Sequence, residues 1–155
     1  QNAPFLPMYD AWKAGSRPLL PMDDEAARRQ ALEIDAKVLS NRRPPYSLSG
    51  GVYDALCDAG GDMEKATNDD IRAMQQLFLG TEGIDIHPAA AVALQGLLNA
   101  FGAGKLPRES VAMLNVTGGG ERRFKQEHAC HYLKPSLIGR ASDPGIVEKI
   151  ENLFR

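Results

Sequence analysis

The spacing of apolar and polar positions along this chain predicts mainly helices. The clearest pattern follows Asp23, where four apolar residues recur at intervals of three or four: Ala27, Ala31, Ile34 and Val38. This spacing places all four on one face of a helix. Asp23 is a typical N-cap residue, and the pair Pro44 and Pro45 prevents a helix from continuing. We therefore predict a helix from Asp23 to about Ser40.

Prolines and glycines mark the ends of the other predicted helices. A proline fits the first turn of a helix, where its missing N–H is not needed, and a glycine suits the left-handed residue that ends one. Asn68 is a suitable N-cap for the segment whose apolar face ends in Phe78. The predicted helices are Pro7 to Ala14, Val52 to Ala59, Asn68 to Gly83, Pro88 to Phe101, and Asp143 to Phe154 with Pro144 in its first turn.

Two segments are too short for helices and predict extended structure. Ser110 to Val116 is apolar enough for a buried strand, and a brief extended piece is expected at Met63 to Ala66. The loop Thr117 to Gly120 follows the carboxyl end of the predicted strand, which is where ligands bind in open α/β sheets. The patterns together indicate an α/β fold that is rich in helices and has few strands.

The sequence NVTGGGERRFK raises the question of what its three consecutive glycines hold. Bare backbone at Gly118 to Gly120 lets main-chain N–H groups approach an anion, and Arg122, Arg123 and Lys125 follow at once. The glycine spacing fits neither a Walker loop nor the dinucleotide-binding fingerprint. A flexible turn with a solvated basic end therefore remains an alternative to an anion site.

The composition of the chain argues against nucleic-acid and membrane partners. The formal net charge of -2 gives no overall positive field, so we expect no nucleic-acid partner. No apolar stretch is long enough to cross a membrane, and we expect no membrane partner. The two cysteines form no disulfide framework, which favours a reducing cytoplasm.

Two other kinds of chemistry find little support. Metal-ligand types gather at Glu127, His128, Cys130 and His131, but no second pair stands at zinc-site spacing, so no metal is expected. A serine hydrolase would need a nucleophile elbow of the Gly-x-Ser-x-Gly type, which the sequence lacks. His87, just before a predicted helix, taken alone is a packed or surface histidine.

Three stretches, in order, resemble threonine-synthase-type enzymes of the fold-type-II pyridoxal-phosphate family. QNAPFLPMYDAWKAG resembles a helix that follows the cofactor's phosphate-binding region. EGIDIHPAAAVALQGL resembles the family's Glu-Gly-Ile and Glu-Pro-Ala-Ser-Ala helix entry, and VAMLNVTGGG the strand that ends in Thr-Gly-His-Gly. The resemblance implies the C-terminal part of the large domain of a tryptophan synthase β-like fold.

Departures from the threonine synthase pattern resemble the cysteate synthase branch of the family. His87 stands where threonine synthases usually carry Glu, Ala90 replaces Ser, and Gly119 replaces His. This resemblance implies that sulfite replaces the phosphate of O-phosphoserine, giving cysteate for coenzyme M biosynthesis. Anionic substrates agree with the basic residues that follow the glycines.

The resemblance also implies that residues 1–155 are a single C-terminal segment of a larger two-domain enzyme. The family's Schiff-base lysine and phosphate loop precede the region matched here. The sequence Phe124 to Gln126 resembles the Phe-Lys-Asp/Asn sequence around the family's lysine. It follows the last family motif instead of preceding the first, so Lys125 is not the Schiff-base lysine. We expect the chain alone to be inactive and the whole enzyme to be a homo-oligomer.

By the same resemblance, Thr117 binds the pyridine nitrogen of pyridoxal 5'-phosphate. A second group of residues is expected around the cofactor pocket or a substrate anion: Gly118, Gly119, His87, Arg122 and Arg123. Two alternatives stay open. One is threonine synthase, acting on O-phosphohomoserine, and the other is a noncatalytic binding or assembly domain.

Overall fold

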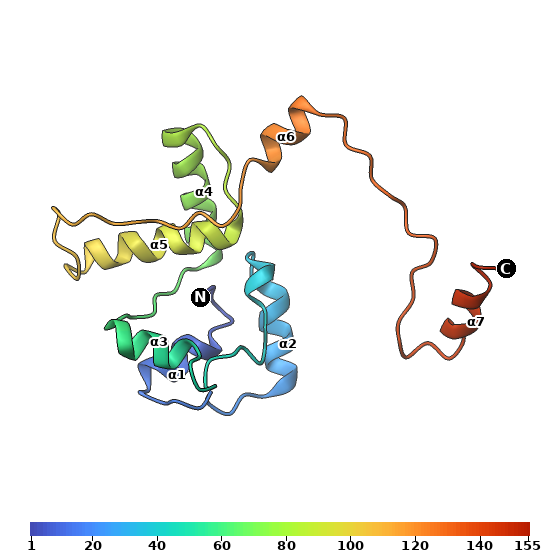
Figure 1. The fold of residues 1–155 in the computed structure, drawn as a ribbon, viewed down its shortest axis with the longest axis horizontal. Helices are drawn as coiled ribbons and strands as arrows, with labels where there is room; N and C mark the ends of the chain where they lie inside the picture. The colour runs from blue at the N-terminus through green and yellow to red at the C-terminus, as the bar shows by residue number, and fades with distance from the viewer. The chain divides into compact units, whose positions relative to one another are not determined.

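The computed structural model describes residues 1–155, which form two units, Gln1–Phe124 and Lys125–Arg155. It contains seven α-helices and one 3-10 helix, labelled in Figure 1 apart from the 3-10 helix η1. The elements are α1 Pro7–Lys13, α2 Asp24–Glu33, η1 Lys37–Leu39, α3 Val52–Ala59, α4 Asn68–Glu82, α5 Pro88–Gly102, α6 Glu121–Glu127 and α7 Ile146–Glu151. No helix combines the length and the apolar character that crossing a membrane requires.

Helices α1, α3, α4 and α5 confirm the predictions made from prolines and glycines. Pro7 and Pro88 lie in the first turns of α1 and α5. Gly60 and Gly83 end α3 and α4 in the left-handed conformation, with φ of 60° and 71°. Only a residue without a Cβ adopts that conformation readily, so the sequence determines these ends locally.

Helix α2 is shorter than predicted, because tertiary packing ends it early. Its N-cap is Asp23 as expected, whose carboxylate accepts a hydrogen bond from Ala26 N at 2.8 Å. The helix nevertheless ends at Glu33, and Ile34 is extended and fully buried beside Phe5. Val38, expected on the same apolar face, lies on η1 with most of its surface exposed.

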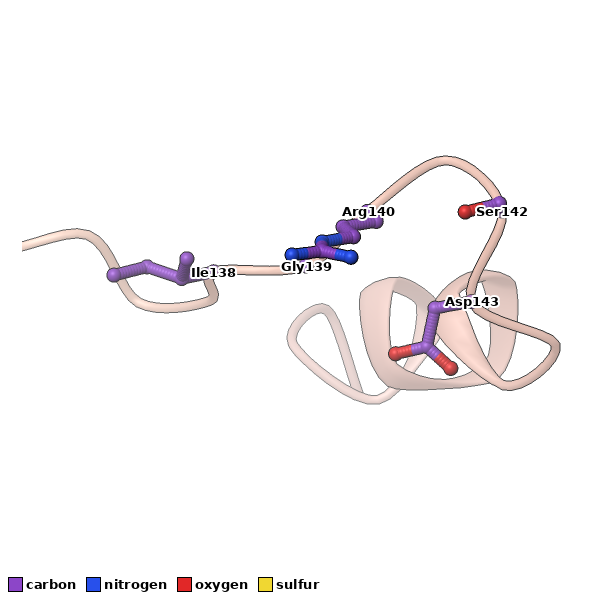
Figure 2. A pocket seen from close by; sticks show the side chains of 5 residues that line it. All are labelled: Ile138, Gly139, Arg140, Ser142 and Asp143. Carbon is purple, nitrogen blue, oxygen red and sulfur yellow. The ribbon is translucent and has the colours of Figure 1, made fainter.

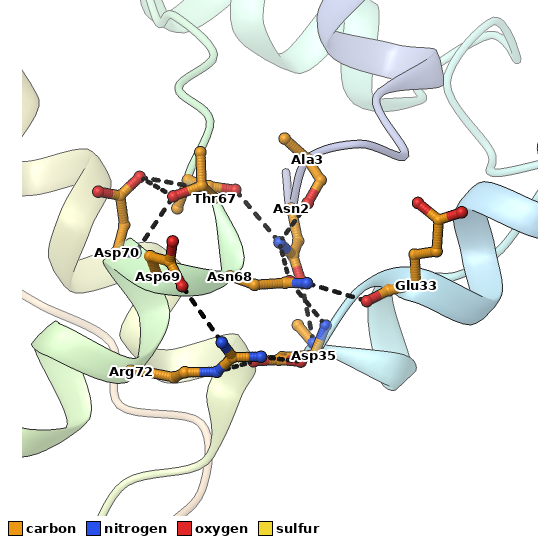
Figure 3. A network of polar contacts seen from close by, with 11 residues as sticks. Asn2, Ala3, Glu33, Asp35, Thr67, Asn68, Asp69, Asp70 and Arg72 are labelled. Carbon is orange, nitrogen blue, oxygen red and sulfur yellow. Dashed lines mark hydrogen bonds and ion pairs between the residues drawn. The ribbon is translucent and has the colours of Figure 1, made fainter.

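The start of α4 corrects the predicted N-cap. Thr67, and not Asn68, caps the helix, and it forms a capping box with Asp70. The Asn68 amide instead donates to the Glu33 carbonyl oxygen at 2.9 Å and accepts from Asp35 N at 2.9 Å (Figure 3). Asn68 therefore joins α4 to the end of α2, a use of its side chain that helix capping would preclude.

The fully buried Asn2 completes this polar network (Figure 3). Its amide nitrogen donates to Asn68 Oδ1 at 3.1 Å and to the Ala66 carbonyl oxygen at 3.2 Å. Its amide oxygen accepts from Ala36 N at 3.0 Å. The network thus ties the N-terminal segment to both helices, and every buried side-chain polar atom finds a partner.

The predicted strand at Ser110 to Val116 is wrong for this structure. The segment has no regular secondary structure, and Val111 and Met113 are almost fully exposed. Pairing is limited to two isolated bridges, Asn2 with Ala66 and Ile86 with Gly119, and the extended piece predicted at Met63 to Ala66 contributes only Ala66 to them. A strand needs a neighbour to complete its backbone hydrogen bonds, and unit 1 places none beside this segment.

The core of unit 1 consists of two small clusters. Helices α4 and α5 pack together, and η1 packs against α5. The larger cluster lies there, with six buried residues: Ala36, Ala66, Ile71, Ile86, Ala90 and Ala91. The smaller one joins Phe5 to Ala27 and Ile34. The larger cluster therefore holds the turn between α4 and α5 in place, and the candidate site lies at that turn.

The C-terminal helices differ from the predictions in number and length. Helix α6 was not predicted, because the glycines before it favour a loop. Helix α7 covers Ile146–Glu151 only, so Asp143 and Pro144 precede it. Asp143 instead accepts from Gly145 N at 3.3 Å and pairs with Lys149 at 3.0 Å, which keeps these residues in a turn before the helix.

Candidate functional site

The loop Thr117 to Gly120, called the glycine loop below, lies directly against the turn that precedes α5. His87 N donates to the Gly118 carbonyl oxygen at 2.9 Å, and Gly120 N donates to the Asp85 carbonyl oxygen at 2.7 Å. Between these two bonds, Ile86 and Gly119 form an isolated antiparallel bridge. The structure therefore brings His87 and the predicted loop together, although 30 positions separate His87 from Thr117.

This close approach explains two of the three glycines. A Cβ on Gly118 would lie 2.7 Å from His87 Nδ1, and a Cβ on Gly119 would lie 2.3 Å from the Asp85 carbonyl oxygen. Both distances are too short for atoms that are not bonded, so neither position accepts a side chain unless its neighbour moves. The bare backbone allows one chain segment to pack against another, whichever ligand the loop meets.

A pocket of about 480 Å³ opens beside this contact. Thr117 is exposed and lines it, so its hydroxyl group is accessible to a ligand. His87, Pro88 and Ala89 contribute the wall at the start of α5. A further part of the wall comes from residues 35–38, between α2 and the end of η1.

Charged groups flank this Thr117 pocket. His87 Nε2 lies 3.5 Å from Glu121 Oε2, and the two side chains are each about half exposed. Arg122 N donates to Asp85 Oδ2 at 3.0 Å, and this hydrogen bond is the main reason that the pKa of Asp85 is lowered. Asp85 therefore stays ionised and holds the first turn of α6 beside the glycine loop.

The structure gathers only some of the predicted site residues in the pocket. Thr117 and His87 line it, and Gly118 and Gly119 form the contact behind it. Arg122 and Arg123 follow on α6 and do not line the pocket. Their role with an anion stays a prediction.

Three charged lining residues were not predicted from the sequence: Asp35, Lys37 and Glu121. Asp35 and Lys37 reach the pocket only through the break between α2 and η1, which no local signal indicated. The Lys37 ammonium donates a hydrogen bond to the Leu32 carbonyl oxygen. Glu121 directly follows the glycines, and that position was its only sequence signal.

The pocket fits one edge of a pyridoxal-phosphate ring in its chemistry. A neutral hydroxyl group at Thr117 can donate to a ring nitrogen. Pro88 and Ala89 offer small apolar surfaces against which an aromatic ring can lie.

The residues of the chain form no group of three or more His, Cys, Asp or Glu side chains that could hold a metal ion.

A separate pocket of about 430 Å³ lies in the second unit, before α7 (Figure 2). Five residues line it: Ile138, Gly139, Arg140, Ser142 and Asp143. Asp143 is engaged by Lys149, and none of the predicted site residues contributes to this pocket.

Comparison with known proteins identifies relatives over nearly the whole chain, although no family model matches it. A cysteate synthase of Methanosarcina mazei is 42% identical over 149 residues, which are 96% of this chain and 36% of that protein. A cysteate synthase of Methanocella paludicola is 47% identical over 138 residues, covering 88% of this chain and 32% of the relative. A cysteate synthase of Methanoculleus marisnigri is 43% identical over 144 residues, covering 92% and 34%.

The resemblance to the cysteate synthase branch is thus confirmed, and the chain spans about a third of the length of these relatives. The alternatives, threonine synthase and a noncatalytic domain, gain no support from the relatives described. By its sequence, the chain is a relative of the cysteate synthases and corresponds to about a third of one.

Proposed function

We propose that this chain is the C-terminal part of a pyridoxal-phosphate-dependent cysteate synthase. The whole enzyme makes L-cysteate and phosphate from O-phospho-L-serine and sulfite, as a step of coenzyme M biosynthesis in the cytoplasm. The observation that carries the proposal is the identity of 42% and 47% to two cysteate synthases over 96% and 88% of the chain.

In this proposal the reaction exchanges one group on the β carbon of serine. A proton leaves Cα, the electron pair of that bond forms a double bond to Cβ, and the bond between Cβ and the phosphate oxygen breaks with its electron pair leaving on the phosphate. The sulfur of sulfite then supplies the electron pair for a new bond to Cβ, and a proton returns to Cα. Pyridoxal phosphate, when bound, withdraws electrons from the substrate's Cα and so allows a group to leave from Cβ.

Thr117 positions the cofactor ring in this scheme. Its exposed hydroxyl group would donate a hydrogen bond to the pyridine nitrogen, and Pro88 and Ala89 would contact the ring with small apolar surfaces. A neutral hydroxyl group stabilises a protonated ring less than a carboxylate would. This favours replacement at Cβ over reactions that would require the ring to hold more negative charge.

His87 and the basic residues of α6 serve the anions. His87 lines the Thr117 pocket beside Glu121 and can donate a hydrogen bond to an oxygen of phosphate or sulfite. Arg122 and Arg123 lie at the start of α6, where they attract anions towards the loop. The lysine that carries the cofactor lies in the part of the enzyme outside this chain.

Exposed apolar side chains support the view that more protein covers this unit. Val111 and Met113 are almost fully exposed in a segment with no strand partner. Their apolar surface is in contact with water, which is unfavourable in free energy. We propose that the rest of the enzyme covers Ser110 to Val116. We also propose that the whole enzyme is a homo-oligomer.

The test uses the full natural polypeptide that contains this chain. Its absorbance spectrum should show a band of lysine-bound cofactor that changes when O-phosphoserine is added. Cysteate and phosphate should then form in equal amounts, and only when sulfite is present. O-phosphohomoserine with water, tested in parallel, should give no threonine. Threonine formation would support threonine synthase instead, and the lack of any cofactor band would support a noncatalytic domain.

A further inference from the structure

A third pocket, in the first unit, is lined by three arginines. Its volume is about 630 Å³, and it opens between the N-terminal half of α2 and two loop segments. The lining residues are Leu19, Leu20, Met22, Asp24, Arg28, Asn41, Arg42 and Arg43. It shares no residue with the Thr117 pocket, so a ligand here would be additional to the cofactor and the reacting substrates.

The charge of this arginine pocket is unbalanced. Arg42 Nη1 lies 3.3 Å from Asp24 Oδ1, which is a long ion pair on an exposed carboxylate. No carboxylate lies within ion-pair distance of Arg28 or Arg43. By contrast Arg29, the next residue on α2, pairs with Glu25 at 2.9 Å. Positive charge therefore gathers in the pocket although the chain as a whole has a formal net charge of -2.

Fixed contacts hold the two loop segments in position. Tyr46 is fully buried, and its hydroxyl group donates to the Ser16 carbonyl oxygen at 3.0 Å, which ties the two loops together. Ser16 Oγ in turn donates to the Pro18 carbonyl oxygen at 2.6 Å. Pro44 restricts the backbone of Arg43. The walls are thus positioned before a ligand arrives, which lowers the entropy cost of binding.

The donors and the apolar wall together define the class of ligand. Guanidinium groups donate paired, charge-assisted hydrogen bonds that match the oxygens of a tetrahedral anion. Leu20 and Met22 stay substantially exposed at the rim, where they can cover a short hydrocarbon group. A free inorganic anion would leave this apolar surface uncovered.

We propose that the arginine pocket binds a small organic phosphate or sulfonate. The oxyanion lies among Arg28, Arg42 and Arg43, and the hydrocarbon part lies against Leu20 and Met22. The site is a second ligand site that goes beyond the proposed synthase reaction. It requires neither the cofactor nor the reaction for its occupation.

Calorimetric titration of the full natural polypeptide, with its cofactor bound, tests this site. The probes are n-butyl phosphate, n-butanesulfonate and inorganic phosphate. Both butyl compounds should bind, and inorganic phosphate should bind about tenfold more weakly because it cannot cover the apolar wall. Whichever butyl compound binds more tightly identifies the preferred oxyanion. Equal affinity for butyl phosphate and inorganic phosphate would overturn the assignment of an organic ligand.

Substitutions at Arg28 and Arg43, with Arg29 of the same helix as Arg28 for control, separate the site from general charge effects. Arg28→Gln and Arg43→Gln should each weaken binding of the preferred butyl compound about tenfold. Arg29→Gln removes the same charge from the neighbouring, outward-paired position and should change affinity less than twofold. Equal losses in Arg28→Gln and Arg29→Gln, or no loss in Arg28→Gln and Arg43→Gln, would overturn the proposal. Formation of cysteate should be unchanged in these variants, so the outcome does not depend on the proposed synthase reaction.

Discussion

Gly118 packs directly on the imidazole of His87. The Gly118 carbonyl oxygen accepts a hydrogen bond from His87 N at 2.9 Å, and a Cβ on Gly118 would lie 2.7 Å from His87 Nδ1. This contact fixes the distance between the start of α5 and Thr117, and with it the width of the Thr117 pocket. A change at either residue should therefore alter both the local stability and the pocket.

Alanine at the two packed glycines should destabilise the protein to different degrees. Gly118→Ala meets the His87 ring, which is half exposed and can rotate, so we expect a loss of about 1 kcal/mol. Gly119→Ala meets the Asp85 backbone, which cannot move alone, so the loss should be about 2–3 kcal/mol. Urea unfolding measures both variants.

Gly80→Ala is the control for these variants. Gly80 lies inside α4, and a Cβ added there would meet no atom within 4 Å, so alanine should stabilise the protein by about 0.5–1 kcal/mol. A loss of stability in Gly80→Ala that matches Gly119→Ala would mean that the close contacts at the loop are not the cause.

Thr117→Val should weaken cofactor binding in the full natural polypeptide. Valine keeps the shape of the side chain but cannot donate a hydrogen bond, so we expect an affinity loss of about tenfold. Thr117→Ser keeps the hydroxyl group and should stay within about threefold of the parent. Absorbance titration with pyridoxal phosphate measures both. An unaltered affinity in Thr117→Val contradicts the role proposed for this residue.

Asn2→Ala should cause one of the larger stability losses in the first unit. It leaves Ala36 N without its acceptor inside the core and removes the link to Asn68 (Figure 3), a cost of about 2–3 kcal/mol. Thermal or urea unfolding measures the loss. Asn152→Ala replaces an exposed residue at the end of α7 and should change stability by less than about 0.5 kcal/mol.

Acid should destabilise the protein partly through Asp62. Hydrogen bonds from Lys105, then Lys13, hold the pKa of its carboxyl group well below the ordinary value of 3.8. The stability that Asp62 contributes is therefore present above pH 3.8 and is lost as the pH falls towards the lowered pKa. The side chain is partly exposed, so the contribution is only roughly 0.5–1 kcal/mol.

Asp62→Asn tests this pH dependence. The variant should be less stable than the parent at pH 6. The difference should shrink when unfolding is measured at pH 2, because Asp62 is then protonated in the unfolded parent while its lowered pKa keeps it ionised in the native state. Asp58→Asn replaces an exposed carboxylate on α3 and should show little difference at either pH. A difference between parent and Asp62→Asn that stays constant with pH would contradict an electrostatic origin.

The sequence predicted best the features that depend on neighbouring residues alone. Pro7 and Pro88 begin helices, and Gly60 and Gly83 end them, because these residue types fix or permit one backbone conformation. The end of α2 was not predictable in this way. Ile34 leaves the helix to join Phe5 in the core, and that contact joins residues far apart in the chain.

The candidate site was predictable only in part for the same reason. Family resemblance indicated Thr117 and His87, and the structure places both in one pocket. Asp35 and Lys37 reach that pocket from a segment some fifty positions before the α5 start, through the break between α2 and η1. No local pattern carries such information, because only the packing of η1 on α5 brings the two segments together.

The exposed segment from Ser110 to Val116 affects how a polypeptide of this length behaves in the laboratory. Val111 and Met113 are exposed and the backbone of their segment pairs with no strand, so two molecules can associate through its apolar side chains and unpaired backbone groups. Concentrated solutions of the isolated chain should turn turbid, and added protease should cut there first. A polypeptide in which further chain covers this segment, as proposed, should stay clear under the same conditions.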